Sequence, residues 1–265
     1  MSLLLETSVI KVSESNSPLG FETADGGSWP VWHRYLTLDG KRAYELGNIC
    51  STCTFFFERM DGANKKVEVS ELVDLLARGL TSQDQTTIQT LAAMIPTGEY
   101  DAHFLELTPT AVELGTHNDY FVKEQQAVWG IDGFWGMPHN PKVPYYRAGD
   151  RAISPTQRLF EFVMPMYPRT WLDHKQVAKY RAALDEGHKP TAVAISLLDV
   201  KGAAVGDAEE FEHWCLAHYV LDGHHKIEAA AQARKPITLV SFVARERGVS
   251  ALDQVARLRD LLDFR

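Results

Sequence analysis

The stretch HYVLDGHHKIEAAAQARKPITLVSF, residues 218–242, decides the fold that we expect for this chain. The apolar runs 215–222 and 237–244 predict two strands, and residues 226–234 between them predict a short helix. Gly223 allows a backbone conformation at the turn that other residues adopt only with strain. The small residues 229–231 let the helix lie close to a sheet. We therefore predict a strand, a glycine turn, a helix and a second strand in direct succession.

Three nitrogen-bearing side chains follow the glycine, namely His224, His225 and Lys226. The start of a helix carries unpaired N–H groups and the positive end of the helix dipole, so such a turn can bind an anion. The lysine adds a positive charge, and the imidazoles add groups that exchange protons near neutral pH. A phosphate or carboxylate site is one interpretation of this pattern. A structural turn with solvated histidines is the other.

Elements on both sides of this unit predict a mixed architecture. Residues 159–168 and 191–200 read as strands, 173–187 as an amphipathic helix, and the segment after Ser250 as a final helix. In the first half, strands are expected within 31–57 and at 103–107, with helices within 69–79 and 82–96. The glycines, prolines and aromatic rings of 129–149 suit no single regular element, and we place a domain boundary near 148. The prediction is an α+β fold with an N-terminal mixed domain (1–148) and a second α+β domain (149–265).

The stretch ALDEGHKPTAVAI (183–195), together with 218–242, resembles the ParB/sulfiredoxin superfamily over roughly residues 165–245. The shared pattern is a helix ending in glycine, a proline, a strand, a second strand running into a glycine turn with a basic residue, an alanine-rich helix and a closing strand. The residues that carry it are Gly187, Pro190, Gly223, Lys226 and Ala230. The resemblance implies that the turn and helix start hold nucleotide phosphates. Members include nucleotide switches in chromosome partition, sulfinic-acid reductases that use ATP, and kinases of free serine that use ADP.

Two departures from the family pattern narrow this implication. His224 stands where sulfiredoxin-like enzymes have their nucleophilic cysteine, which argues against sulfinic-acid reduction. Lys226 replaces the usual arginine, which keeps the charge but loses the two-pronged geometry that suits phosphate. The helix-turn-helix and basic surface of the partition branch are not visible in the sequence.

These departures leave a protein that binds a nucleotide or a phosphorylated small molecule at Gly223, His224, His225 and Lys226. If the chain is an enzyme, a nucleotide-dependent phosphotransferase using ATP or ADP with Mg²⁺ is expected. Such a reaction needs a carboxylate base. Among Asp222, Asp173 and Glu161 we favour Asp222 because it adjoins the turn, with His224 and His225 as further catalytic candidates.

Three cysteines allow several interpretations. Cys50 and Cys53 form a C-x2-C pair, and the remaining cysteine, Cys215, lies three residues before His218. The pair can be structural, it can be redox-active, or it can join Cys215 and His218 in a Cys3His site for structural Zn²⁺. A strand over 215–221 would place Cys215 and His218 on opposite faces, so the zinc site requires an irregularity there.

The remaining composition bounds the class of protein. Thirty-five acidic residues against twenty-seven lysines and arginines give a formal net charge of −8, which disfavours a nucleic-acid surface. No apolar stretch approaches the length of a membrane helix, and the start lacks the basic segment of a secretory signal. With so few cysteines, the reducing cytoplasm is the expected location. The alternative hypothesis is a non-catalytic, zinc-stapled regulatory or scaffolding module with a degenerate nucleotide site and an unspecified protein partner.

Overall fold

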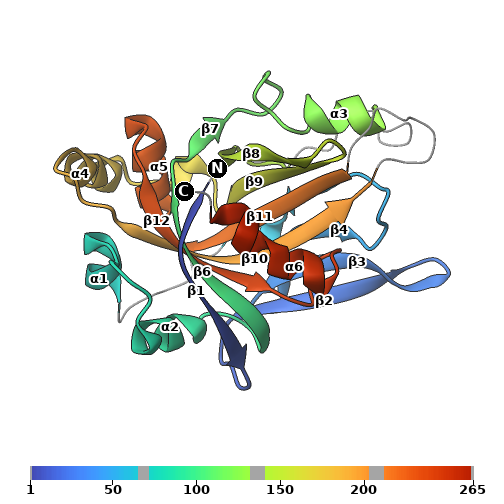
Figure 1. The fold of residues 1–265 in the computed structure, drawn as a ribbon, viewed down its shortest axis with the longest axis horizontal. Coiled ribbons are helices and arrows are strands. Elements are labelled where there is room, and N and C mark those ends of the chain that lie inside the picture. Colours follow the sequence, from blue (N-terminus) through green and yellow to red (C-terminus); the bar gives the residue numbers. More distant parts are fainter. Residues whose placement is uncertain (1, 65–71, 132–140, 203–211, 264–265) are drawn as a thin grey trace.

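The computed structural model describes residues 2–64, 72–131, 141–202 and 212–263, and their strands and helices form an α+β fold, as expected (Figure 1). The strands are β1 Leu3–Val12, β2 Leu19–Gly26, β3 Trp29–Leu38, β4 Lys41–Asn48, β5 Glu58–Arg59, β6 Gly98–Leu107, β7 Thr110–Val112, β8 Tyr145–Ser154, β9 Gln157–Pro165, β10 Thr191–Lys201, β11 Glu212–Asp222 and β12 Ile237–Ala244. The helices are α1 Val73–Arg78, α2 Gln85–Ala92, α3 Glu124–Trp129, α4 His174–Asp185, α5 His224–Ala233 and α6 Leu252–Leu262, with short 3-10 turns η1 Asp61–Ala63 and η2 Arg169–Trp171.

Eight of these strands form one sheet in the order β1-β6-β12-β10-β11-β9-β8-β7. β10 runs parallel to β12, and β9 runs parallel to β11. The other neighbouring pairs are antiparallel. The central strands β10, β11 and β12 are buried over almost their whole length because both faces of the sheet are covered.

This sheet takes strands from both sides of the expected domain boundary. Residue 148 lies inside β8, and β6 pairs with β12 along a ladder that joins Leu107 to Ile237. The hydrogen bonds of a sheet link segments that are far apart in sequence, and composition alone does not reveal them. In the described residues the two halves of the chain therefore share one sheet.

A second sheet, β2-β3-β4-β5, packs on one face of the large one. The ring of Tyr44 on β4 meets that of Tyr219 on β11 with centroids 4.9 Å apart, and its hydroxyl donates to the carbonyl of Pro165 at 2.6 Å. Arg34 on β3 pairs with Asp199 on β10, and both side chains are buried. The N-terminal strands thus form one wall of the main core.

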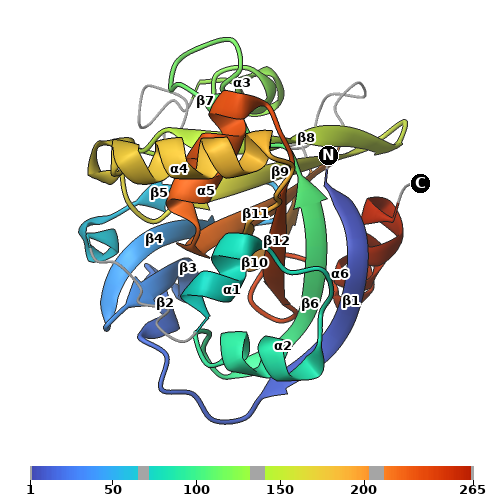
Figure 2. The same cartoon turned by 90° about the vertical axis from the view of Figure 1, so that its left-hand side faces the viewer.

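Helices cover the opposite face of the large sheet (Figure 2). Val177 and Leu184 of α4, Ile227 of α5 and Leu258 of α6 are buried in one cluster there. Ala229 and Ala230 are fully buried, so α5 approaches the sheet as closely as its small residues allow. In the part of the chain that the structure describes, no helix has the length and apolar character needed to cross a membrane.

The strand expected at 54–59 is reduced to β5, Glu58–Arg59. The side chain of Gln125 takes the place of a strand neighbour at Phe55: its Oε1 accepts from the Phe55 N–H at 2.9 Å and its Nε2 donates to the Phe55 carbonyl at 3.2 Å. Phe55 and Phe57 are both buried, with their rings stacked at 5.8 Å. The aromatic run therefore belongs to a buried loop, in which the side chain of Gln125 forms hydrogen bonds with the backbone of Phe55.

Candidate functional site

The predicted glycine turn lies at the junction of β11 and α5. Gly223 is the N-cap of α5 and has φ 103°, in the left-handed region that favours glycine. A Cβ atom built on it would lie 2.6 Å from the Cβ of Ala192 on β10. The turn therefore requires glycine for its conformation and also for the close approach to β10.

Gly223→Ala is expected to lower the free energy of unfolding by about 2 kcal/mol, since the left-handed backbone and the contact with Ala192 both oppose a methyl group. The matched control is Gly187→Ala, because Gly187 also has positive φ but has open space around it. This control is expected to cost about 1 kcal/mol. Urea unfolding of the two variants measures the difference, and equal losses would show that Ala192 does not restrict the turn.

Lys226 points into the protein. Its ammonium group donates to the carbonyl of Thr191 at 2.8 Å and to Oδ2 of Asp222 at 2.6 Å. The residue is only 4% exposed. Burial lowers the pKa of Lys226, and the neighbouring Asp222 opposes that shift. The charge expected to face an anion is thus already paired inside the fold.

The two histidines also make contacts within the protein. Nε2 of His224 accepts from the backbone N–H of Met166 at 3.0 Å, and its ring stacks on Tyr167 with centroids 3.8 Å apart. Nε2 of His225 accepts from the backbone N–H of Asp173 at 3.0 Å. A ring nitrogen that accepts carries no proton, so both imidazoles are neutral with the proton on Nδ1 in this arrangement. These hydrogen bonds tie α5 to the residue after β9 and to the N-cap of α4, which is the structural role that the sequence left open beside ligand binding.

Asp222 is the most accessible of the charged groups at the turn. Its side chain is 29% exposed, and Lys226 holds Oδ2. The hydroxyls of Tyr167 and Tyr180 lie close enough to sense its charge. Burial first and Asp222 second raise the pKa of both tyrosines, that of Tyr167 to about 12. The turn therefore presents an oriented carboxylate beside the positive end of α5. The other two candidate bases are less available to a substrate. Asp173 is the N-cap of α4, and Glu161 is fully buried in the sheet.

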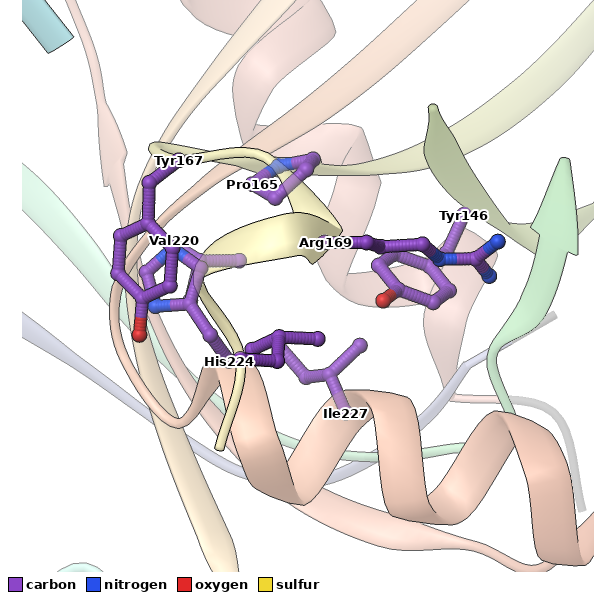
Figure 3. A pocket seen from close by; sticks show the side chains of 8 residues that line it. Tyr146, Pro165, Tyr167, Arg169, Val220, His224 and Ile227 are labelled. Atoms are coloured by element: carbon purple, nitrogen blue, oxygen red, sulfur yellow. The ribbon is translucent and has the colours of Figure 1, made fainter. Parts of the chain in front are cut away.

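A small hollow lies beside the first turn of α5 (Figure 3). The rings of His224 and Tyr167 lie on one side of it, and Tyr146 and Arg169 lie on the other. The space open to a water molecule is about 10 Å³, enough for one water. A nucleotide at this turn would therefore bind on the outer surface and not in the hollow.

Glu228 on α5 binds two of the side chains that line this hollow, a role that the sequence did not reveal. Its carboxylate accepts from the Tyr146 hydroxyl at 2.6 Å and pairs with Nε of Arg169 at 3.1 Å. Arg169 also pairs with Glu113. Burial and the carboxylate of Glu228 raise the pKa of Tyr146 well above its usual value. The only sequence signal for this network was a glutamate one turn into an alanine-rich helix.

The structure does not bring the four expected zinc ligands together. Cys215 faces the core between the sheets, where its thiol donates to the Tyr120 hydroxyl at 3.7 Å. His218 faces the other side of β11 and contacts Ser196 and Glu161. β11 is a regular strand here, so residues three apart point to opposite faces. Within 2–64, 72–131, 141–202 and 212–263, no group of three or more His, Cys, Asp or Glu side chains could hold a metal ion.

Cys50 and Cys53 are partly exposed in the loop after β4. Burial raises the pKa of Cys50, but hydrogen bonds from Cys53 and Thr52 outweigh it and lower the pKa below that of a free thiol. Burial and the interaction with Cys50 raise the pKa of Cys53 to about 11. The two thiols of the pair are therefore inequivalent.

Iodoacetamide at neutral pH is expected to label Cys50 first, Cys53 more slowly, and Cys215 only after unfolding, because the thiolate is the reactive form. Peptide mapping by mass spectrometry gives the three rates. Cys50→Ser is expected to remove the fast phase. Labelling of Cys215 in the folded protein at the rate of Cys50 would contradict this assignment.

Comparisons with known proteins give no match: no family model, no curated protein and no solved structure shows significant similarity to the chain.

Proposed function

We propose that the chain binds a nucleotide or a phosphorylated small molecule at the start of α5, outside Gly223. The observation that carries this proposal is the partly exposed, lysine-held carboxylate of Asp222 next to the first turn of α5. The first turn of an α-helix supplies N–H donors without intrahelical acceptors, and the helix dipole favours negative charge there. Gly223 has no side chain, and this allows the turn to pack closely against Ala192 on β10.

A bound Mg²⁺ would offset the repulsion between the carboxylate of Asp222 and a phosphate at the same turn. This ion prefers oxygen ligands and is commonly held by one or two carboxylates together with the phosphates of the nucleotide. Asp222 offers one such oxygen, and the phosphates of the nucleotide, with water, would complete the coordination. When bound, the ion neutralises charge on the phosphates.

Phosphate transfer is the reaction that this arrangement would suit. In such a transfer an acceptor hydroxyl would give up its proton while its oxygen forms a bond to the terminal phosphorus and the bond to the leaving phosphate oxygen breaks; Asp222 would accept that proton only where its free oxygen does not hold Mg²⁺. Lys226 orients the carboxylate from inside the fold. His224 and His225 are positioning residues, because their rings bond to the backbone of Met166 and Asp173.

The order of elements supports membership of the ParB/sulfiredoxin superfamily. α4, β10, β11, α5 and β12 follow one another as the family pattern requires, with Gly187 after α4 and Gly223 between β11 and α5. We propose on this ground that the second half of the chain is a domain of this superfamily joined to the first half through the shared sheet.

A thermal-shift series with ADP and ATP tests the proposal. A ligand at 100 times its Kd that binds only the folded protein adds about 2.7 kcal/mol of stability, so a clear rise in Tm is expected with Mg²⁺ present. Asp222→Asn is expected to weaken the Mg²⁺-dependent part about tenfold, since it removes the charge that the ion needs. Asp253→Asn, at an exposed position of α6, is the matched control and is expected to behave as wild type. No shift with either nucleotide at millimolar concentration would reject the proposal.

A non-catalytic regulatory or scaffolding module is the second candidate. The observation that favours it is the internal pairing of Lys226, His224 and His225, which leaves few ligand-facing side chains at the turn. Under this hypothesis nucleotides leave the Tm unchanged. The zinc staple that the sequence suggested for this module has no assembled ligand set in the described residues.

A further inference from the structure

A second hollow is lined by residues of α6, of the edge strand β1 and of its neighbour β6. In Figure 1 these elements lie away from the start of α5. Its space open to water is about 360 Å³, within the usual range of small-molecule sites. Polar and charged residues form much of its lining, with Val9 and Val255 as apolar parts. The charged residues come from β6, from the turn after β12 and from α6, so only the folded chain brings them together.

His103 on β6 lines this hollow and is only 2% exposed. Neither of its ring nitrogens has a hydrogen-bond partner. An unsatisfied buried polar group costs about 1–3 kcal/mol, and in native proteins such groups usually mark a missing partner. Burial lowers the pKa of His103 to about 4, so the ring is neutral at physiological pH and has one N–H to donate.

Two arginines lie around the same hollow. Arg245 donates to Asp101 through both Nε at 3.2 Å and Nη2 at 2.7 Å. Arg259 of α6 makes no side-chain hydrogen bond or ion pair with another described residue, although it lies close enough to His103 to disfavour a charge there. With Asp101 balancing one arginine, the lining keeps one uncompensated positive charge.

Behind His103 a row of buried polar side chains crosses the sheet. Ser241 is its ladder partner on β12, and the Ser241 hydroxyl donates to that of Ser196 at 2.8 Å. The row continues to His218, whose Nδ1 lies 2.7 Å from the Ser196 hydroxyl and whose Nε2 lies 3.1 Å from Oε1 of Glu161. His218 and Glu161 are fully buried, so this serine–histidine–glutamate series has no access to substrate. The unpartnered end of the row is His103, at the hollow.

We propose that this hollow binds a small organic monocarboxylate, whose carboxylate pairs with Arg259 and accepts from His103 and whose short apolar chain packs on Val9 and Val255. The single uncompensated positive charge matches one carboxylate. A dianion such as phosphate would exceed it, and the apolar lining would oppose its hydration. This site is independent of the turn at Gly223.

Butyrate is the probe and butyramide its uncharged control. NMR spectra of the histidine rings are expected to show the His103 nitrogens shifting with butyrate at a Kd of millimolar order, and much less with butyramide. Arg259→Gln should weaken butyrate binding at least about tenfold. Arg257→Gln on the same helix should leave it unchanged, because Arg257 stacks on Trp214 and does not line the hollow.

Equal binding of butyrate and butyramide would overturn the proposal. So would butyrate affinity that Arg259→Gln leaves intact, or tighter binding of inorganic phosphate than of butyrate. Asp222→Asn is expected to leave butyrate binding unchanged, so the result is separable from that of the nucleotide test.

Discussion

Asp199→Ala is expected to lower the free energy of unfolding by about 3–5 kcal/mol, because it leaves the guanidinium of Arg34 buried without its partner. The two side chains are 8% and 3% exposed. Asp199 accepts from Nη1 and Nη2 of Arg34 at 3.1 and 2.7 Å, and from the backbone N–H of Val249 at 2.6 Å. One substitution therefore breaks three hydrogen bonds between the small sheet, the large sheet and the segment before α6.

Urea unfolding of two control variants gives the comparison. Glu22→Ala breaks an ion pair with Arg42 whose side chains are nearly two-fifths exposed, and it is expected to cost less than about 1 kcal/mol. The double variant Arg34→Met/Asp199→Leu removes both charges and should be more stable than Asp199→Ala alone. A loss below 1 kcal/mol for Asp199→Ala would show that the two sheets do not depend on this pair.

Acidification is expected to destabilise the protein as the pH falls from about 6.5 to about 4, with a contribution of about 3 kcal/mol from His103. Burial lowers the folded-state pKa of His103 to about 4 and that of His213 to about 3. In this interval the unfolded chain binds protons that the folded chain does not. The stabilisation is therefore complete above the unfolded pKa and is lost as the pH falls toward the folded one.

Unfolding free energies measured between pH 6.5 and pH 4 test whether stability falls as the pH falls. His103→Gln is expected to reduce the slope of the profile, since glutamine does not titrate, and the contribution of His213 remains. His117→Gln, at an exposed position, should leave the slope unchanged. A profile that stays flat between pH 6.5 and 4 in the wild type would contradict burial of neutral His103 and His213.

The second half of the chain follows its sequence pattern closely because its elements have strong local signals. The run 237–244 predicts β12 at its observed bounds, and 173–187 predicts a helix where α4 lies, with Asp173 found as its N-cap. The first half does not, since β1 and β2 have half-exposed, weakly alternating sequences. Their pairing partners are remote in sequence, and only the ladder to β6 and the hairpin with β3 define them.

The position of the glycine turn and its helix was predicted from the sequence, but the direction of the side chains at the turn was not. Gly223 and the helix start lie where the pattern places them, whereas Lys226 turns inward to Thr191 and Asp222. A sequence shows which groups are near a turn, but the direction of each side chain depends on the elements packed around it. His103 had no local signal at all, because its isolation arises from where β6 lies in the sheet and from the position of α6.

The central claim is that phosphate groups bind at the start of α5, and amide NMR spectra recorded during a titration with ADP and Mg²⁺ test it most directly. The account predicts that the N–H signals of residues 223–226 move most, and that Asp222→Asn reduces the movement. ADP that shifts no signal in this turn, or shifts signals only elsewhere, would contradict it.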